Sequence, residues 1–306
     1  MRIIRDTQAI TEQGVMATIG FFDGVHLGHR FLIDEVKAAA AQRGLPSAVI
    51  TFPAHPRAVL QQDYQPRLLN SFEEKLRLLA TTGVDYCIVL DFTEALSQLS
   101  AEAFLQILAQ EWHVKGLVIG YDHRFGHDRR DGFEQYVRYG QQWGIEVVKA
   151  EAFDAGHTAV SSSEIRRLIQ EGQVERAAQL LTYDYPLSGR IVSGYKVGRT
   201  LGFPTANIQP DDPTQLLPGI GVYAVWVEVA GERHKGMLYI GSRPTLDNGT
   251  QLSIEVHILH FSGDIYDEPI RVTFARFVRG DEKFDSLAAL KAQLMRDREV
   301  VERLLN

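Results

Sequence analysis

The chain has 306 residues, 45% of them hydrophobic, so it is long enough for two domains that each bury a core. Its formal net charge is −7, and it has no long run of Lys and Arg, which argues against nucleic acid as a main partner. The N-terminus lacks an apolar segment of signal-peptide length, and no run of about 18 apolar residues occurs, so we expect a cytoplasmic chain without a membrane partner. The single cysteine, Cys87, lies in an apolar segment and is interpreted as structural.

The first half alternates apolar segments of strand length with amphipathic segments. In the amphipathic segments, apolar residues recur three and four positions apart, as they do on one face of a helix. This alternation predicts an α/β domain in which a parallel sheet carries helices on both faces. The predicted strands are Val15–Gly20, Ser47–Phe52, Asp85–Leu90, Gly116–Tyr121 and Ile145–Ala150.

The pattern changes after residue 160. Two short helices are predicted, the first opening with a capping box of Ser161 and Glu164 and ending at Gly172, and the second over Gln173–Leu181. We place the domain boundary near Asp184, which gives domains of residues 1–184 and 185–306.

The segments after the boundary alternate apolar and polar residues and are separated by Gly, Pro and Asp turns. They predict an antiparallel sheet or barrel with strands at Val222–Val229, Lys235–Ile240, Leu252–His260 and Ile270–Val278. One long helix is expected from Ser286 to Leu304. Its predicted apolar side consists of Leu287, Leu290, Leu294, Val301 and Leu304.

A glycine-rich turn follows the first predicted strand of the sheet and leads into a helix that begins near Leu27. In a doubly wound sheet ligands bind at the carboxyl ends of the strands, and a helix N-terminus offers N–H groups to phosphate. His26 and His29 can face the same anion and stabilise the charge that develops in nucleotidyl transfer, so we predict that both are catalytic. The predicted nucleotide-binding residues of this turn are Gly20, Phe21, Phe22, Asp23, Gly24, His26, Gly28 and His29.

The alternative is that His26 and His29 are a helix cap and a surface residue. The pattern H-x-G-H directly after a strand and a G-x-F-D-G turn favours the functional interpretation. This half contains neither a P-loop pattern nor G-x-G-x-x-G, so phosphate binding must depend on a different structural motif.

Three further segments are expected at the same site, because two of them follow strands and the third opens a helix. Each also has an ordinary structural interpretation: a loop punctuated by proline, an exposed charged loop and a plain capped helix. The candidates in the two loops are His55, Pro56, Asp122, His123, Arg124 and Phe125, and those at the helix start are Ser162, Ser163 and Arg166.

The second half has its own glycine-rich segment, which runs from Gly189 to Asn207 and spaces three glycines through a loop after a strand. Spaced glycines let a backbone curl round phosphates, and Thr205 with Asn207 supplies two neutral oxygen ligands suited to Mg²⁺. A set of β-turns is an equally good interpretation of this segment alone. The predicted nucleotide-binding residues are Gly194, Gly198, Arg199, Gly202, Pro204, Thr205 and Asn207.

Strand Leu252–His260 adds an acid–base group. Its apolar residues alternate, so Glu255 and His257 project from the opposite face. An alcohol nucleophile must lose a proton in a kinase reaction, and Glu255 is the candidate base. On periodicity alone this face could equally be solvated.

Taken together, the N-terminal motifs resemble the FAD synthetase module of bacterial bifunctional flavin enzymes over nearly all of residues 14 to 184. The resemblance rests on H-x-G-H, T-F-x-x-H-P, D-x-R-F-G and S-S-[ST]-x-I-R. It implies an adenylyltransferase in which His26 and His29 stabilise the ATP phosphates and the 162–166 segment closes over them. The residues at 55–56 and 122–125 would then contact flavin. His123 and Glu164 depart from the family pattern.

The stretch G-x-x-x-G-R-x-L-G-F-P-T-A-N resembles the signature of riboflavin kinases. That family implies a six-stranded barrel with a C-terminal helix, Mg-ATP at Thr205 and Asn207, and Glu255 as base for the 5′-hydroxyl of riboflavin. Flavin would pack between the barrel and the last helix. Asp267 stands where relatives usually carry glycine.

The two resemblances predict one bifunctional enzyme that converts riboflavin to FMN and FMN to FAD with ATP and Mg²⁺, as a monomer or weak homo-oligomer. An alternative within enzymes is another H-x-G-H adenylyltransferase fused to a barrel with a different task. From a different class, the barrel could bind flavin or RNA without catalysis. An RNA-binding barrel would show basic residues between exposed aromatics and would not need Glu255.

Overall fold

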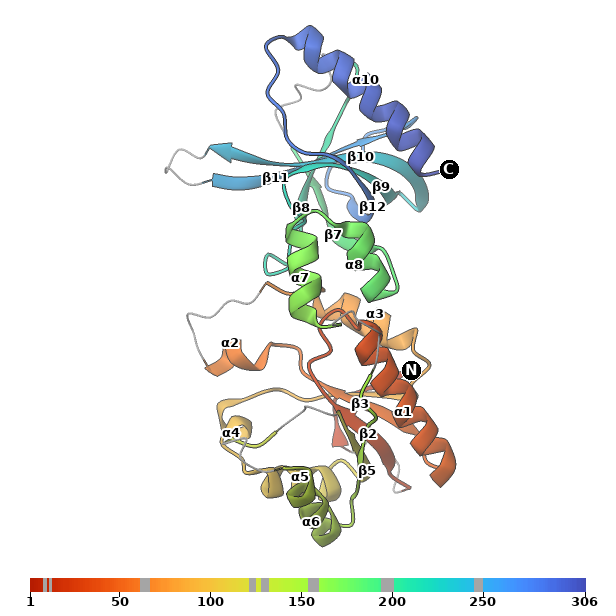
Figure 1. Ribbon diagram of the computed structural model, residues 1–306, viewed down its shortest axis with the longest axis vertical. Helices are drawn as coiled ribbons and strands as arrows, with labels where there is room; N and C mark the ends of the chain where they lie inside the picture. Colours follow the sequence, from red (N-terminus) through yellow and green to blue (C-terminus); the bar gives the residue numbers. More distant parts are fainter. Residues whose placement is uncertain are drawn as a thin grey trace. The chain divides into compact units, whose positions relative to one another are not determined.

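The computed structural model describes residues 1–7, 10, 13–60, 67–120, 125–127, 132–153, 160–193, 201–244 and 250–306, with only the backbone of residues 243, 244, 250 and 251. These residues form two compact units, Met1–Ser161 and Ser162–Asn306 (Figure 1). Within them, no helix combines the length and the apolar character needed to span a bilayer. Each unit is described separately below.

The first unit is built on a six-stranded parallel sheet with the order β1-β4-β3-β2-β5-β6. The chain proceeds from β2 to β3 and β4 in one direction and from β5 to β6 in the other, so the order reverses between β2 and β5. Such a reversal leaves a crevice at the carboxyl ends of the strands, where ligands bind. The strands are β1 (Arg2–Ile4), β2 (Val15–Ile19), β3 (Ser47–Thr51), β4 (Tyr86–Val89), β5 (Val114–Ile119) and β6 (Glu146–Lys149).

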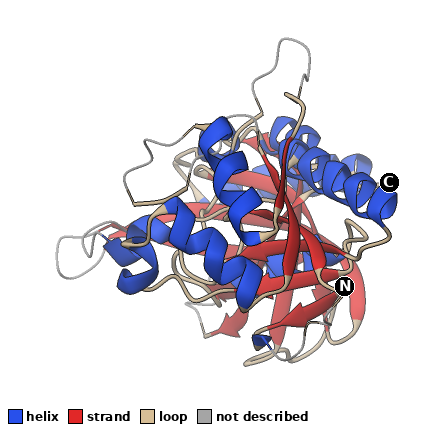
Figure 2. Ribbon diagram, turned by 90° about the horizontal axis from the view of Figure 1, so that it is seen from below, coloured by secondary structure: helices blue, strands red, loops and turns tan. Residues whose placement is uncertain are grey.

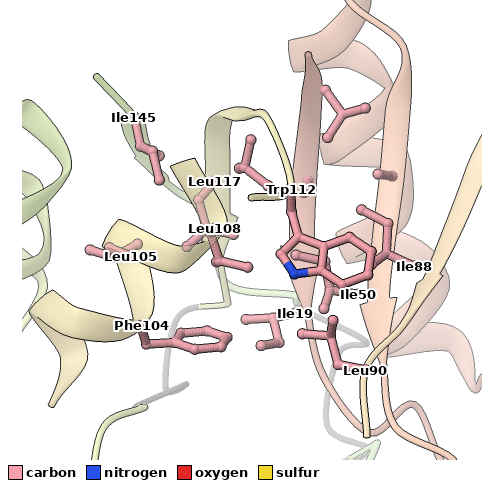
Figure 3. Packing of buried hydrophobic residues seen from close by; sticks show 14 of the residues in the cluster. Ile19, Ile50, Ile88, Leu90, Phe104, Leu105, Leu108, Trp112, Leu117 and Ile145 are labelled. Atoms are coloured by element: carbon pink, nitrogen blue, oxygen red, sulfur yellow. The ribbon is translucent and has the colours of Figure 1, made fainter. Parts of the chain in front are cut away.

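Helices pack on both faces of this sheet because successive strand residues point to opposite sides. Ile19 belongs to the larger core, which Figure 3 shows with Phe104 and Leu108 of α5 facing the sheet. Met16 belongs to a smaller core with Val36 of α1. The helices of this unit are α1 (Leu27–Arg43), α2 (Pro56–Leu60), α3 (Phe72–Ala80), α4 (Glu94–Ser97), α5 (Ala101–Gln110) and α6 (Phe133–Trp143).

The α/β fold predicted for the first half is confirmed, and all five predicted strands are present. Their ends differ by one or two residues, most clearly in β5, which begins at Val114 instead of Gly116. Strand β1, which pairs with the edge of β4, is not among the predicted strands. Cys87 is buried in β4, and burial raises the pKa of its thiol to about 11, in agreement with a structural role.

The second unit begins with two short helices, α7 (Ser162–Gln170) and α8 (Val174–Leu181), at the positions predicted for them. Helix α8 packs against strands of the barrel, and the Glu175 carboxylate accepts a hydrogen bond of 3.0 Å from the backbone N–H of Phe277. The compact units therefore divide before α7, whereas the predicted boundary lies after α8 at Asp184. The assignment of the residues before Asp184 to the first functional domain stays a prediction.

A closed antiparallel barrel with the order β10-β11-β8-β7-β12-β9 forms the body of the second unit. Its six strands and the final helix, whose end lies by the C-terminus marked in Figure 2, confirm the fold predicted for the second half. One strand, which begins at Ala206 near the end of the glycine-rich segment, is not among the predicted strands. The strands are β7 (Tyr185–Val192), β8 (Ala206–Pro210), β9 (Gly221–Val229), β10 (Glu232–Pro244), β11 (Thr250–Ile258) and β12 (Pro269–Arg279).

The last helix, α10 (Leu287–Leu304), covers part of the barrel with a narrow apolar stripe. Val301 and Leu305 are buried there, and Leu290 and Leu294 pack beside them. The prediction is wrong for the first and last leucines of the expected apolar side. Leu287 lies in the first turn of the helix, Leu304 lies off the stripe, and both are exposed.

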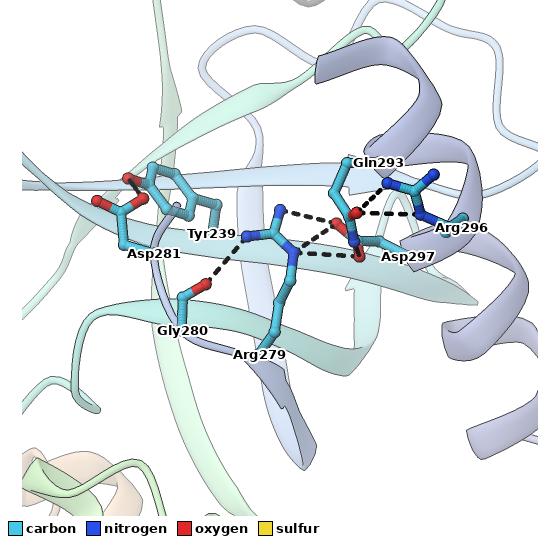
Figure 4. A network of polar contacts seen from close by, with 7 residues as sticks. All are labelled: Tyr239, Arg279, Gly280, Asp281, Gln293, Arg296 and Asp297. Atoms are coloured by element: carbon cyan, nitrogen blue, oxygen red, sulfur yellow. Dashed lines mark hydrogen bonds and ion pairs between the residues drawn. The ribbon is translucent and has the colours of Figure 1, made fainter. Parts of the chain in front are cut away.

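A buried ion pair attaches α10 to the end of β12 (Figure 4). The Arg279 guanidinium donates to both carboxylate oxygens of Asp297, with Nε–Oδ1 at 3.1 Å and Nη2–Oδ2 at 2.9 Å. Gln293 donates to the same carboxylate at 2.7 Å. Asp297 is only 2% exposed, so these partners replace the water that its carboxylate loses on burial and fix the helix against the strand.

Asp267, where relatives of the predicted family usually carry glycine, adopts a φ of 64°. This left-handed conformation is the one that glycine adopts readily, and aspartate tolerates it better than most residues. Its backbone N–H donates to Ile191 O at 3.0 Å, and its carbonyl accepts from Arg190 at 3.0 Å. Asp267 therefore forms a left-handed bend that these two hydrogen bonds hold in place.

Candidate functional sites

The turn between β2 and α1 has a strained backbone. Phe22, Gly24 and Val25 have φ values of 56°, 84° and 38°. Glycine adopts such values without cost, but a β-branched residue does so rarely, and strain of this kind concentrates at functional sites. Because Phe22 and Val25 are buried, the surrounding fold holds the turn in this conformation.

His26 and His29 lie in contact at the start of α1. Their rings are stacked, with centroids 3.6 Å apart and planes inclined by 17°. His26 is the N-cap residue of the helix, and its Nδ1 accepts a hydrogen bond of 3.4 Å from the backbone N–H of His29. The two histidines thus stand where free N–H groups and the helix dipole favour an anion.

The imidazole of His29 is held in its neutral form. Burial lowers the pKa of His29 well below its ordinary value of 6.5, and the nearby His26 and Lys75 lower it further. The Nδ1 atom of His29 is buried and finds no hydrogen-bond partner within the described part of the chain. The Nδ1 atom therefore keeps an unused capacity for a hydrogen bond inside the site.

Lys75 of α3 is a buried cation attached to the same turn. Its Nζ donates to Phe21 O at 3.0 Å and to Phe52 O at 2.8 Å, and it lies 3.9 Å from the centroid of the Phe21 ring. Burial lowers the pKa of Lys75 to about 8, although the carboxylate of Asp23 opposes this shift. The ammonium therefore links the turn after β2 to the end of β3.

Two more contacts fix the turn to neighbouring elements. The hydroxyl of Thr51, at the end of β3, donates to Phe21 O at 3.1 Å. The carboxylate of Asp23 accepts a hydrogen bond of 2.9 Å from the backbone N–H of Leu69. Gly28 lies in the first turn of α1, where a Cβ atom would approach the His26 ring at 3.4 Å. Asp23, which was predicted to bind the nucleotide, thus holds the turn in place by a hydrogen bond to the backbone of Leu69.

The candidates from the predicted flavin loops lie in different surroundings. His55 is half-buried, and its ring meets that of Phe21 at 4.7 Å, while Pro56 begins α2. Phe125 is buried in the larger core and stacks on Tyr136 at 4.3 Å, which is the environment of a structural residue. Asp122, His123 and Arg124 lie outside the described residues. Flavin contact by any of these residues stays a prediction.

The predicted helix-start candidates open α7 in the second unit. Ser162 and Arg166 are half-buried and Ser163 is exposed. Glu164, which departs from the family pattern, accepts from Arg167 at 2.7 Å. Their predicted role in holding the ATP phosphates stays a prediction.

The barrel brings its predicted acid–base and metal-binding residues together. The Thr205 hydroxyl donates to the Glu255 carboxylate at 3.3 Å, and Glu255 on β11 lies directly opposite Asn207 on β8. Asn207 is buried, while Thr205 and Glu255 are half-buried. A hydroxyl, an amide and a carboxylate thus converge, and all three supply the hard oxygen donors that Mg²⁺ prefers.

The backbone around these residues follows from the glycine-rich segment. Gly202 adopts a φ of 85°, which reverses the chain immediately before Phe203 and Pro204. Phe203 is buried against the barrel, whereas Pro204 is exposed. Gly194, Gly198 and Arg199 lie outside the described residues.

Tyr239 of β10 faces Glu255 from the neighbouring strand. Its hydroxyl donates to Asp281 at 2.8 Å (Figure 4). Burial raises the pKa of Tyr239 to about 12, and the hydrogen bond to Asp281 and the charges of Asp281 and Glu255 add to the effect. The phenol therefore stays protonated beside the carboxylate.

Lys75 is the residue that sequence reasoning missed. It lies in an amphipathic helix with two glutamates before it, and a lysine in such a segment is usually solvated.

A basic, nitrogen-rich turn at the reversal of a parallel sheet suits the transfer of a nucleotidyl group. An oxygen-rich strand pair in a small barrel, with a carboxylate beside the candidate metal ligands, suits phosphoryl transfer to a hydroxyl. Together these features define the class of two-unit transferases that act with nucleotides.

Comparisons with known proteins are more specific. The FAD synthetase family matches residues 8–164 and the riboflavin kinase family residues 181–305. The bifunctional riboflavin kinase/FMN adenylyltransferase of Listeria monocytogenes is 40% identical over 95% of this chain and 92% of its own length. The protein of the same description in Escherichia coli K12 is 36% identical over 97% of this chain and 96% of its own length.

A crystal structure from Streptococcus pneumoniae, described as that of a macrolide-efflux protein, aligns with a TM-score of 0.85 and 32% identity over 98% of each chain. That description applies to the streptococcal protein, and the likeness shows a shared fold. The present chain belongs to the family of bifunctional riboflavin kinases/FMN adenylyltransferases. The family predicted from the sequence is confirmed.

Proposed function

We propose that this chain converts riboflavin to FMN and FMN to FAD at two separate sites, one in each compact unit. The activities are those of its family. The observation that supports the assignment of sites is a double convergence. The stacked pair of His26 and His29 lies at a helix start in one unit, and Glu255 lies beside Thr205 and Asn207 in the other.

In the adenylyltransferase site, a phosphate oxygen of FMN attacks the α-phosphorus of ATP. A new P–O bond forms, the bond between the α-phosphorus and the bridging oxygen breaks, and pyrophosphate leaves. The neutral His29 and the neighbouring His26 bind the oxygens on which charge increases, together with N–H groups at the start of α1. Because the attacking phosphate is already ionised, no protein base is required.

In the kinase site, the 5′-hydroxyl of riboflavin attacks the γ-phosphorus of ATP and ADP leaves. The attacking oxygen must lose its proton, and the Glu255 carboxylate receives it. Before substrate binds, that carboxylate accepts a hydrogen bond from the Thr205 hydroxyl, so the base is already oriented toward the predicted nucleotide ligands.

The donor set of the barrel site fits Mg²⁺. Thr205 and Asn207 would hold the ion with neutral oxygens, and Mg²⁺ ordinarily completes its shell with nucleotide phosphates and water. When bound, it would neutralise charge on the β- and γ-phosphates. Mg²⁺ dependence, a cytoplasmic location and a monomer or weak homo-oligomer stay predictions of the sequence.

The test is a two-step assay in which the full chain receives riboflavin, ATP and Mg²⁺ and the flavins are separated by chromatography. Wild-type protein should form FMN first and FAD second. His29→Ala should form FMN at the wild-type rate and accumulate it, with adenylylation reduced by roughly 10²- to 10³-fold, as for loss of one group that stabilises developing charge.

The matched control is His127→Ala, which removes an exposed imidazole from the same unit and should form FAD normally. Loss of FMN formation in a folded His29→Ala protein would contradict the separation of the two sites. Absence of both products from wild-type protein would contradict the proposed function itself.

A further inference from the structure

His257 is a buried polar residue that neither proposed reaction uses. It projects from the same face of β11 as Glu255, two residues away, and is only 9% exposed. A buried imidazole requires a hydrogen-bond partner, and the partner here belongs to the segment that carries Thr205.

The Nδ1 atom of His257 lies 2.8 Å from the carbonyl oxygen of Pro204. A carbonyl oxygen only accepts hydrogen bonds, so Nδ1 carries the hydrogen and donates. This contact fixes the tautomer of the ring. Burial lowers the pKa of His257, although the bond to Pro204 opposes the shift, so the ring stays neutral at neutral pH.

This hydrogen bond lies just beyond the end of the backbone ladder between β8 and β11. The ladder between β8 and β11 consists of the pairs Glu255 with Asn207 and Val256 with Ala206. Continuation of the antiparallel register would place His257 opposite Thr205, but the ladder ends there. The side chain of His257 binds the chain one residue further on, at Pro204, and so extends the attachment past the last backbone pair.

The same ring also packs against an aromatic neighbour. It meets the Phe203 ring edge-on at 5.2 Å, and the guanidinium of Arg298 lies 5.8 Å from the centroid of that ring. The His257 ring therefore contacts residues 203 and 204 in two ways, through an edge-on aromatic contact and through a hydrogen bond.

We propose that His257 is a positioning residue for the riboflavin kinase reaction. It fixes the Pro204–Thr205 peptide to the strand that carries Glu255 and thereby keeps the Thr205 hydroxyl at the base. The inference rests on the proposed function of this site. His257 itself touches neither the nucleotide nor the reacting hydroxyl.

Two substitutions separate positioning from packing. His257→Leu keeps the apolar contact with Phe203 and removes the donor, whereas His257→Asn places an amide N–H near the position of Nδ1 and leaves a smaller side chain. We expect kcat/KM for Mg-ATP in FMN formation to fall about 10- to 100-fold in His257→Leu, as misplacement of a catalytic group by about 1 Å does. His257→Asn should recover activity to within about threefold of wild type.

A packing role predicts the reverse order, because leucine fills the volume and asparagine does not. His257→Leu with wild-type kinase activity, or His257→Asn no more active than His257→Leu, would overturn the inference. His260→Asn changes an exposed histidine two residues beyond the end of β11 and should be silent. Adenylylation of supplied FMN should be unchanged in all three variants.

If His257→Leu does not fold, the position of the ring hydrogen of His257 in the wild-type protein provides the test. Long-range proton–nitrogen NMR spectra of wild-type protein, assigned by comparison with His257→Asn, should show hydrogen on Nδ1, and hydrogen on Nε2 alone would overturn the inference. Failure of the wild-type chain to phosphorylate riboflavin would instead contradict the proposed function of the barrel.

Discussion

The two proposed sites would bind phosphate through different kinds of atoms. In the α/β unit the groups that meet at the start of α1 are nitrogens: the rings of His26 and His29, free backbone N–H groups and, bonded to the turn itself, the ammonium of Lys75. In the barrel the converging groups are oxygens, from Thr205 and Glu255 with Asn207 on the neighbouring strand. One site would offer donors directly to phosphate, and the other would reach phosphate through a metal ion.

The nature of the nucleophile explains this difference. A phosphate that attacks a phosphorus atom is already ionised, so it needs no carboxylate to act as a base. An alcohol must lose a proton as it attacks, so a carboxylate is needed and a cation has to balance it. The composition of each site therefore indicates the group that attacks there, and the two sites should respond differently to substitution.

The largest effect is expected for Glu255→Gln, which tests the oxygen-rich site. Glutamine keeps the size of the side chain and can still accept the Thr205 hydrogen bond, but it cannot take a proton at neutral pH. FMN formation should fall by roughly 10²- to 10⁴-fold. The rate is measured with riboflavin and Mg-ATP, and adenylylation of supplied FMN by the same variant should equal that of wild type.

Glu228→Gln is the control, because Glu228 is an exposed strand glutamate on β9 of the same barrel. It should leave both rates unchanged. Kinase activity that survives in Glu255→Gln would show that the carboxylate is not the base and would remove the main contrast between the two sites.

A smaller effect, of about tenfold, is expected for Lys75→Met, which tests the nitrogen-rich site. The change removes the two hydrogen bonds that hold Phe21 and Phe52, and bonds from a charged donor each contribute about 1.5–3 kcal/mol. The rate of adenylylation should fall while FMN formation is unaffected. Loss of the ammonium should also raise the pKa of His29, which shifts the acid limb of the adenylylation pH profile upward.

Arg77→Met removes an exposed cation from the same helix and serves as the matched control. An equal loss of adenylylation activity in both variants would show that the loss comes from a disturbed α3 helix and not from the missing ammonium of Lys75. An unchanged pH profile in Lys75→Met would show that the ammonium stabilises the turn without acting on His29.

The sequence allowed most of the fold to be predicted, because buried strands and amphipathic helices have distinct periods. It failed where an element is short or depends on its neighbours. Strand β1 has three residues, of which two are exposed, and gains its order by pairing with β4. Strand β8 ends in proline and follows a glycine-rich segment, so it resembles a loop until β7 and β11 pair with it.

The residues of the two sites could be predicted from the sequence to different extents. His26 and His29 are close in sequence, so helical spacing alone places them together. Glu255 and Thr205 are far apart in the chain, and their proximity was expected only through the family resemblance. Lys75 and His257 were given no role. The burial of Lys75, in a helix of the kind that usually lies at the surface, depends on the tertiary structure, and so does the place where the ladder between β8 and β11 ends beside His257.

The smallest expected effect concerns stability against pH and tests whether His29 is buried as a neutral group. Its pKa in the folded chain lies well below the ordinary value of 6.5, which applies to the unfolded chain. Below pH 6.5 the unfolded state therefore binds more protons than the folded state, and the free energy of unfolding falls as the pH falls.

Between pH 7.5 and 5.5 this single group should cost up to about 1.4 kcal/mol, and the loss should be absent from His29→Gln, which cannot be protonated. Urea unfolding of both proteins at the two pH values, followed by a probe of the first unit, measures the difference between them. Histidines other than the stacked partner His26 contribute equally to both proteins and cancel. An identical pH dependence in wild type and His29→Gln would mean that His29 titrates normally and is open to solvent. The nitrogen-rich site would then bind phosphate with a charged imidazole, in closer analogy to the metal ion expected in the barrel.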